Sequence, residues 1–184
     1  GSRGGEVRRI GPVFAATVAG VLAAKPGLQV IIPAATPALA DRLRAQFAAV
    51  DVRVLDGQSR TAMAAADALL LASGTAALEG ALVGRPMVVG YRLNRLTGWW
   101  VRRLLKVKHV ALPNHLTAQP HVPEFLLERC RPELLMPAVQ SALDDDDQQA
   151  MTAFAEIHRT LATNAAARAA NAVTALLARV ASIQ

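Results

Sequence analysis

A short polar turn before a helical segment holds the residues best suited to chemistry. Ser73, Gly74 and Thr75 follow an apolar run, Ala68–Ala72, and Glu79 lies four residues beyond Thr75. The unpaired N–H groups and partial positive charge of a helix N-terminus attract an anion, most often phosphate. Gly74 lets the backbone approach closely, and Ser73 or Thr75 can cap the helix. The Glu79 carboxylate is suited to accept hydrogen bonds from a ribose diol.

The same residues also have a plainer interpretation. Small residues at a turn between a strand and a helix are often only a cap. A glutamate one turn into a helix is often only a solvated side chain. Taken alone, the turn therefore leaves phosphate binding and a purely structural role open.

Apolar runs alternate with helical patterns along most of the chain, and this alternation predicts an α/β fold with a doubly wound parallel sheet. In such sheets ligands bind outside the carboxyl ends of the strands, where Ser73–Thr75 falls. The expected strands are Leu28–Pro33, Val52–Leu55, Ala68–Ala72, Met87–Gly90 and His109–Leu112. The expected helices are Glu6–Ala24 (with Pro12 near its true start), Pro37–Phe47, Thr61–Ala66, Ala76–Val83, Val122–Arg129, Arg131–Leu143 and Gln148–Val180, the last broken at Thr163-Asn164.

Composition and charge narrow the class of protein. The chain has 184 residues, of which 53% are hydrophobic and 18% charged, so a folded core is expected. The formal charge of +6 favours an anionic partner: a nucleotide, a nucleic acid or lipid headgroups. The single Cys130 excludes an internal disulfide framework and a Cys-based zinc site. We find no secretory signal and no uninterrupted apolar segment of membrane-spanning length, and we expect a soluble or peripheral intracellular protein.

Both tryptophans of the chain lie in one basic stretch, Asn94–Lys108. One interpretation is a surface helix whose tryptophans enter the core and whose cations are solvated. The other is an interfacial helix with tryptophan at headgroup depth and cations on anionic lipid. The residues that would contact the membrane are Trp99, Trp100, Arg102, Arg103 and Lys106. Nucleic acid is disfavoured, because basic residues and stacking aromatics combine in this one stretch alone.

Asn114 follows the expected strand His109–Leu112, where its amide could reach a ligand or serve only as a turn residue. His109, His115 and His121 suggest a metal, but no carboxylate or cysteine pattern accompanies them, so no metal site is predicted.

The last part of the chain, residues 144–184, is expected to be a helical tail to a nucleotide-binding domain over residues 1–143. Asp144–Asp147 resembles an acidic flank favourable to the dipole of the following helix. The terminal helices could pack on a sheet, reach a missing domain or reach a partner subunit, as in a homodimer through the C-terminal helices.

Three separated segments resemble one family, lipid-A-disaccharide synthase. They are GSRGGEVRRIGPVF at the start, SGTAALEGALVGRPMVVGYRLN from Ser73, and HVALPNHLTAQPHVPEFL from His109. Their order and spacing agree with the family over nearly the whole chain. The resemblance also favours Gly1-Ser2 as native sequence over a vector scar, with a strand expected before Gly1.

The resemblance implies the nucleotide-binding half of a glycosyltransferase with two Rossmann-like domains (GT-B) and inverting chemistry. Such an enzyme transfers 2,3-diacylglucosamine from its UDP derivative to 2,3-diacylglucosamine 1-phosphate (lipid X) and releases UDP. It needs no metal or organic cofactor and works as a peripheral protein on the cytoplasmic face of the inner membrane of Gram-negative bacteria. By resemblance, the UDP-binding residues are Ser2, Arg3, Ser73, Gly74, Thr75, Glu79 and Asn114.

The sequence departs from the family pattern at two places. Leu127 stands where the family usually has Gln, and Ala118-Gln119-Pro120 stands where Gly and a basic residue often follow. The general base is expected in an N-terminal half that this chain lacks, so the chain alone is expected not to turn over. The alternatives are another UDP-sugar enzyme on the same scaffold, or a non-catalytic nucleotide- or lipid-binding module.

Overall fold

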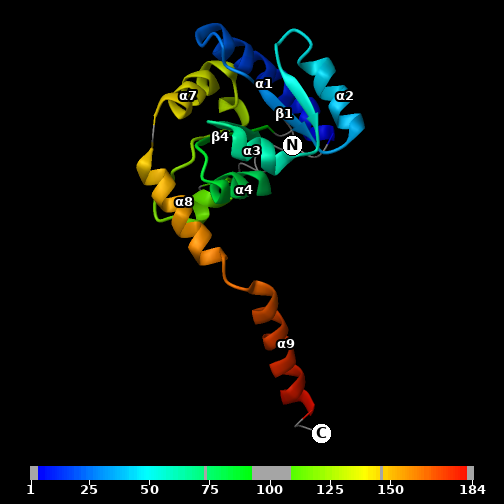
Figure 1. Cartoon of the computed structure of the whole chain (residues 1–184), viewed down its shortest axis with the longest axis vertical. Helices are drawn as coiled ribbons and strands as arrows, with labels where there is room; N and C mark the ends of the chain where they lie inside the picture. The colour runs from blue at the N-terminus through cyan, green and yellow to red at the C-terminus, as the bar shows by residue number, and fades with distance from the viewer. Residues whose placement is uncertain (1–3, 73, 93–108, 146, 182–184) are drawn as a thin grey trace.

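A computed structural model describes residues 4–72, 74–92, 109–145 and 147–181 (Figure 1). Strands and helices alternate as expected, and most boundaries fall within a few residues of the predicted ones. In chain order the elements are α1 (Gly4–Ala24), β1 (Ile31–Ala34), α2 (Pro37–Gln46), β2 (Arg53–Asp56), α3 (Ser59–Ala65), β3 (Leu69–Ala72), α4 (Thr75–Val83), β4 (Met87–Tyr91), α6 (Leu112–Leu116), β5 (Glu124–Leu126), the 3₁₀-helix η1 (Leu127–Arg129), α7 (Pro132–Asp144), α8 (Gln148–Leu161) and α9 (Ala165–Ala181).

All the strand pairs are parallel, but the strands divide into two sheets. β1 pairs with β2, and β4 lies between β3 and β5. Among the residues that the structure describes, no hydrogen-bond ladder joins β1 to β3. The prediction of a parallel α/β arrangement is therefore confirmed, whereas the predicted doubly wound sheet stays a prediction.

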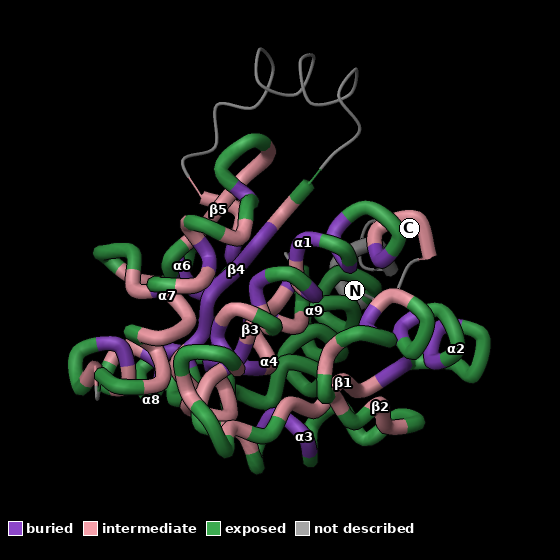
Figure 2. Tube along the Cα trace, turned by 90° about the horizontal axis from the view of Figure 1, so that it is seen from above, coloured by how far each residue is buried: buried purple, intermediate pink, exposed green. Residues whose placement is uncertain are grey.

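Helices cover both faces of the β3–β4–β5 sheet, and β4 forms its centre. The side chain of Val88 packs with α1 and α7, whereas Met87 and Val89 face α4 and α8. This alternation follows from the two-residue period of a strand. Figure 2 shows β4 buried along most of its length, as expected for a parallel strand covered on both faces.

Helix α1 connects the two sheets through their cores. Its Ile10 and Val13 pack with α7 and the β3–β4–β5 sheet, and its Val7 and Ala15 pack with α2 and β1. The helix begins at Gly4, so the expected start near Pro12 is wrong. Pro12 lies on the exposed face, where water can satisfy the carbonyl that loses its helical partner.

Two other predicted elements are wrong, both around residues 109–129. His109–Leu112 is not a strand; a short helix, α6, starts at Leu112, with Pro113 in its first turn. Proline suits that position because its amide hydrogen is not needed there. Residues 122–129 are not a helix either, because Glu124–Leu126 pairs with β4 and η1 follows.

The tail forms two helices, broken where Thr163-Asn164 predicts. Asp147 caps α8 by accepting a hydrogen bond from the Ala150 N–H at 2.9 Å, in line with the predicted acidic flank. Phe154 and Ile157 of α8 are buried against the α4 face of the sheet. Helix α9 instead projects away from the body (Figure 1), and its described side chains are exposed.

Cys130 is buried between α1 and the sheet, beside Gly90 of β4. Burial raises the pKa of the Cys130 thiol, and the nearby Arg92 charge lowers it by less. The thiol therefore stays protonated at neutral pH and behaves as a small core residue.

Gly90→Ala should lower the free energy of unfolding by about 1–3 kcal/mol, because the added methyl group overpacks a rigid core. An ideal Cβ at Gly90 would lie 2.8 Å from Cε1 of Phe14 and 3.1 Å from the Cys130 sulfur. The measurement is urea denaturation of both proteins.

Gly80→Ala in α4 is the matched control. Its Cβ would meet the flexible ends of Leu69 and Met87 at 2.9 and 3.1 Å. Alanine also gains up to ~1 kcal/mol of helix propensity over glycine, so this change should be close to neutral. Equal losses in the two variants would contradict the packing assigned to Gly90.

Candidate nucleotide site at the start of α4

Helix α4 begins directly beyond the carboxyl end of β3 with an open N-terminus. Gly74 occupies the N-cap position with φ 144°, a conformation that favours glycine, and no side-chain hydrogen bond caps the helix. Nothing lies within 4 Å of an ideal Cβ at Gly74, and both Gly74 and Thr75 are exposed. The sequence offered Ser73 or Thr75 as the cap of this helix. Thr75 is instead its first helical residue, and Gly74 occupies the cap position. The first amides of α4 are thus open to an external acceptor.

Glu79 lies one turn further along α4 and is half-buried. Among the described residues it makes no hydrogen bond or ion pair. The first turn of α4 carries no acidic residue, so its partial positive charge is not neutralised there. An open row of amides and a free carboxylate one turn away can bind a phosphate and a neighbouring diol together.

Several predicted site residues lie outside the described residues. These are Ser2, Arg3 and Ser73 of the predicted UDP site, and Trp99, Trp100, Arg102, Arg103 and Lys106 of the predicted membrane contact. Their roles stay predictions.

The side chain of Asn114 makes its hydrogen bonds within the protein. Its side chain is buried, and its Nδ2 donates to the Val122 carbonyl at 2.8 Å and to Glu124 at 2.7 Å. Its Oδ1 accepts from the N–H groups of His121 and Val122, both at 2.9 Å. Every donor and acceptor of this amide is used within the protein in this structure, which favours the structural alternative, and the predicted ligand contact stays a prediction.

Glu124 completes this network, and sequence reasoning missed it. Its carboxylate accepts the N–H groups of Val110 and Ala111 at 2.8 and 3.1 Å as well as the Asn114 amide. The side chain is 8% exposed. The sequence does hold a signal for this role. Glu124 is the single acid within the apolar run VPEFLL, and a carboxylate that is buried there needs hydrogen-bond partners.

The three histidines do not form a metal site. The Nε2 of His115 lies 2.8 Å from the His109 carbonyl oxygen, and the two rings meet edge to face at 6.3 Å. Within the described ranges, no group of three or more His, Cys, Asp or Glu side chains could hold a metal ion.

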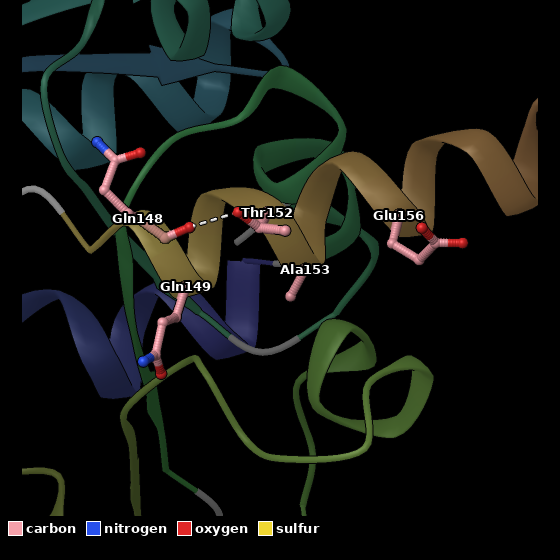
Figure 3. Close-up of a pocket in the computed structure, with 5 residues that line it drawn as sticks. All are labelled: Gln148, Gln149, Thr152, Ala153 and Glu156. Atoms are coloured by element: carbon pink, nitrogen blue, oxygen red, sulfur yellow. Dashed lines mark hydrogen bonds between the residues drawn. The ribbon is translucent and has the colours of Figure 1, made fainter.

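Two hollows lie away from α4. The first is lined by α8 alone, through Gln148, Gln149, Thr152, Ala153 and Glu156 (Figure 3). Its lining has no cation, and the Thr152 hydroxyl donates to the Gln148 carbonyl at 2.8 Å, so it does not suit a diphosphate. The second, of about 450 Å³, lies beside the Glu124 network, between His109 and Arg129.

Among the described residues, one helix meets the length and composition of a membrane span, against the expectation from sequence. It is α1, and 39% of its most apolar window is buried. A core helix of a soluble protein passes the same test. Since α1 packs with both sheets, this is weak evidence for a span.

Asn114→Ala should lower the free energy of unfolding by at least about 2 kcal/mol, because it leaves buried amides and a carboxylate with fewer partners. Asn171→Ala, on the exposed face of α9, is the control and should change stability by less than ~0.5 kcal/mol. Thermal denaturation and UDP calorimetry of the same variants distinguish a structural role of Asn114 from a contact with the ligand. Loss of UDP binding at unchanged stability would restore Asn114 as a ligand contact.

Comparison with known proteins gives the family. The family model for lipid-A-disaccharide synthetase matches residues 1–177. The chain is 44% identical to the lipid-A-disaccharide synthase of Sodalis glossinidius over 97% of its own length and 48% of the relative's. It is 46% identical to that of Pseudomonas savastanoi pv. phaseolicola and 43% identical to that of Chromohalobacter salexigens, over 96% of this chain and 47% of each relative.

The chain thus spans about half the length of the curated relatives it matches. The family match extends from the first residue through α8 and most of α9. By these matches, the chain belongs to the lipid-A-disaccharide synthetase family.

Proposed function

We propose that this chain is the C-terminal, donor-binding part of a lipid-A-disaccharide synthase. The full-length enzyme would transfer 2,3-diacylglucosamine from its UDP derivative to 2,3-diacylglucosamine 1-phosphate (lipid X) and release UDP. Family membership supports the reaction. The observation that carries the assignment to this part of the protein is the open N-terminus of α4, with Glu79, which has no partner among the described residues, one turn beyond it.

In this proposal the donor's diphosphate binds the amides of Ser73, Gly74 and Thr75, where α4 begins, with Ser2 and Arg3 beside it. Glu79 holds the ribose hydroxyls. The cation of Arg3 and the helix N-terminus would stabilise the charge that grows on the departing UDP, which is electrostatic catalysis. No residue of this chain is assigned as the general base, which we place in the other half of the family's length.

We further propose a GT-B arrangement in which residues 1–143 form one Rossmann-like domain and residues 144–184 its helical tail. β1 and β3 each have an edge without a strand partner among the described residues. One parallel strand between them, supplied from outside this chain, would join the two sheets in the order β2-β1-new-β3-β4-β5. The packing of α1 in the cores of both sheets supports that position.

We place the enzyme on the cytoplasmic face of the inner membrane as a peripheral protein. Its substrates are lipids, and the chain carries a formal charge of +6. Trp99, Trp100 and the cations Arg102, Arg103 and Lys106 would meet the anionic lipid surface.

A homodimer through the C-terminal helices is the arrangement that α9 supports. Val173, Leu176 and Leu177 lie on one face of this projecting helix and are 58–64% exposed. Large apolar side chains gathered on an exposed helix face commonly mark an interface.

UDP binding tests the proposed site. In the full-length protein, Glu79→Ala should weaken UDP affinity about tenfold or more, because hydrogen bonds to a charged group contribute about 1.5–3 kcal/mol. Glu133→Ala removes an exposed carboxylate from α7 and should leave the affinity unchanged. Isothermal titration calorimetry measures both. Equal affinities for the two variants would remove Glu79 from the site.

Substitutions at Thr75 separate the backbone amide from the hydroxyl. Proline is tolerated at the first helical position but has no N–H group. Thr75→Pro should therefore weaken UDP binding with little change in melting temperature. Thr75→Val keeps the amide and should bind nearly as well as the wild type; if valine and proline weaken binding equally, the hydroxyl and not the amide is the contact.

Sedimentation velocity tests the dimer. Leu176→Glu/Leu177→Glu should convert a dimer of the full-length protein to monomers, because four charges would be buried at its interface. Asn171→Glu/Ala175→Glu adds the same charge on the opposite face of α9 and should leave the dimer intact. A dimer that survives the leucine substitutions would place the interface elsewhere.

A further inference from the structure

Leu127 is held in a backbone conformation that is unfavourable for leucine. Its φ of 53° lies in the left-handed region, where the Cβ of a bulky L-residue crowds the following carbonyl oxygen. Among the described residues, Gln58 is the only other non-glycine residue with a positive φ, at 59°. Such strain persists only where the surrounding structure holds it, and it clusters at functional sites.

The turn at Leu127 does not need a leucine. The side chain is half-buried, but it belongs to none of the three hydrophobic clusters that the described residues form. The Leu127 carbonyl accepts a hydrogen bond from the N–H group of Cys130 at 3.2 Å, which glycine or asparagine would also accept. Either residue would adopt this conformation with less strain. The leucine side chain is therefore explained neither by the turn nor by a core.

Leu127 lies at the same edge of the sheet as the candidate nucleotide site. It directly follows β5, whose last residue, Leu126, pairs with Tyr91 of β4, and β4 pairs in turn with β3. Because the three strands are parallel, their carboxyl ends lie at one edge of the sheet, where ligands of α/β proteins bind. Neighbouring strands are about 4.8 Å apart, so the end of β5 lies about 10 Å along this edge from the end of β3.

The chemistry of the proposed donor indicates what Leu127 could contact. A diphosphate at the start of α4, with its ribose at Glu79, leaves the sugar on the far side of the diphosphate. In 2,3-diacylglucosamine this sugar carries two acyl groups, so much of its surface is apolar. A half-buried leucine at the same edge of the sheet can remove part of that apolar surface from water.

We propose that Leu127 contacts the acylated sugar of the donor and determines specificity for it. This inference rests on the proposed function, because it assumes a UDP-sugar bound at the start of α4. It adds to that function a residue at the end of β5 that contacts the sugar and its acyl groups rather than the nucleotide.

Steady-state kinetics of the full-length enzyme with UDP-2,3-diacylglucosamine and lipid X test the contact. Leu127→Asn should lower kcat/KM about fivefold or more through a higher KM for the donor, because an apolar side chain is lost. Asparagine tolerates the left-handed conformation, so the melting temperature should stay the same or rise. Leu127→Met restores an apolar side chain of similar volume and should recover most of the lost kcat/KM.

Gln58→Asn is the matched control. It places asparagine at the other strained residue, which is exposed at the start of α3. Its melting temperature should likewise stay the same or rise, but its kcat/KM should equal that of the wild type. UDP affinity, measured by isothermal titration calorimetry, should be the same in Leu127→Asn as in the wild type, because the contact is with the sugar.

Three results would overturn the proposal. The first is a kcat/KM of Leu127→Asn equal to that of Gln58→Asn. The second is a lower melting temperature of Leu127→Asn, which would show that the leucine packs within the protein. The third is a higher KM for lipid X with an unchanged KM for the donor, which would place Leu127 beside the acceptor.

The wild-type enzyme separates these results from a failure of the proposed function. A full-length wild type that neither bound UDP nor formed the disaccharide would refute the proposed function itself. A wild type that does both, with a Leu127→Asn variant of equal activity, would refute only the role of Leu127.

Discussion

The close packing of α4 on the central sheet is the constraint on which the candidate site depends. Gly80 faces the sheet, and an ideal Cβ there would meet the flexible ends of Leu69 and Met87 at 2.9 and 3.1 Å, so α4 packs closely on β3 and β4 through side chains that can adjust. Ala77 and Ala81 are fully buried on the same face. This contact places the first amides of α4 at the carboxyl edge of β3, where no side chain of the described residues caps the helix.

The buried hydrogen bonds of Asn114 and Glu124 matter because they fix α6, which packs against α4. α6 packs against α4, and α6 is fixed by Asn114 and Glu124 rather than by its own length. A buried carboxylate and amide are costly unless every atom is paired, and here both are paired. The two residues thus act on the site by fixing its surroundings, with no direct contact with a ligand. Such a network specifies one arrangement of the chain, which an apolar core of the same size specifies less sharply.

Sequence reasoning succeeded where structure follows local pattern. The run from Leu69 to Tyr91 was predicted as a strand, a helix and a strand, because its apolar runs and its turn are readable along the chain. Sequence reasoning failed for residues 109–129, where hydrogen bonds between residues far apart in the sequence determine the secondary structure. Glu124 takes the amide hydrogens of Val110 and Ala111 that a strand would use, and β5 forms because β4 offers it an edge. Neither fact can be read from residues 109–129 alone. The same limit hid the hydrogen bonds of Asn114 within the protein.

The start of α4 differs from the starts of α2, α7 and α8, although the short helix α3 also begins without a side-chain cap, an acid or a proline. Thr36 and Asp147 cap α2 and α8 with their own side chains. α7 has no such cap, but it begins with Pro132, which has no amide hydrogen, and carries Glu133 in its first turn. α4 has neither an acid nor a proline in its first turn. A side-chain cap contributes about 0.5–2 kcal/mol, and the chain forgoes it at the one helix start that follows the central sheet's β3. In the proposed site, an external anion would satisfy those amides in place of a side-chain cap.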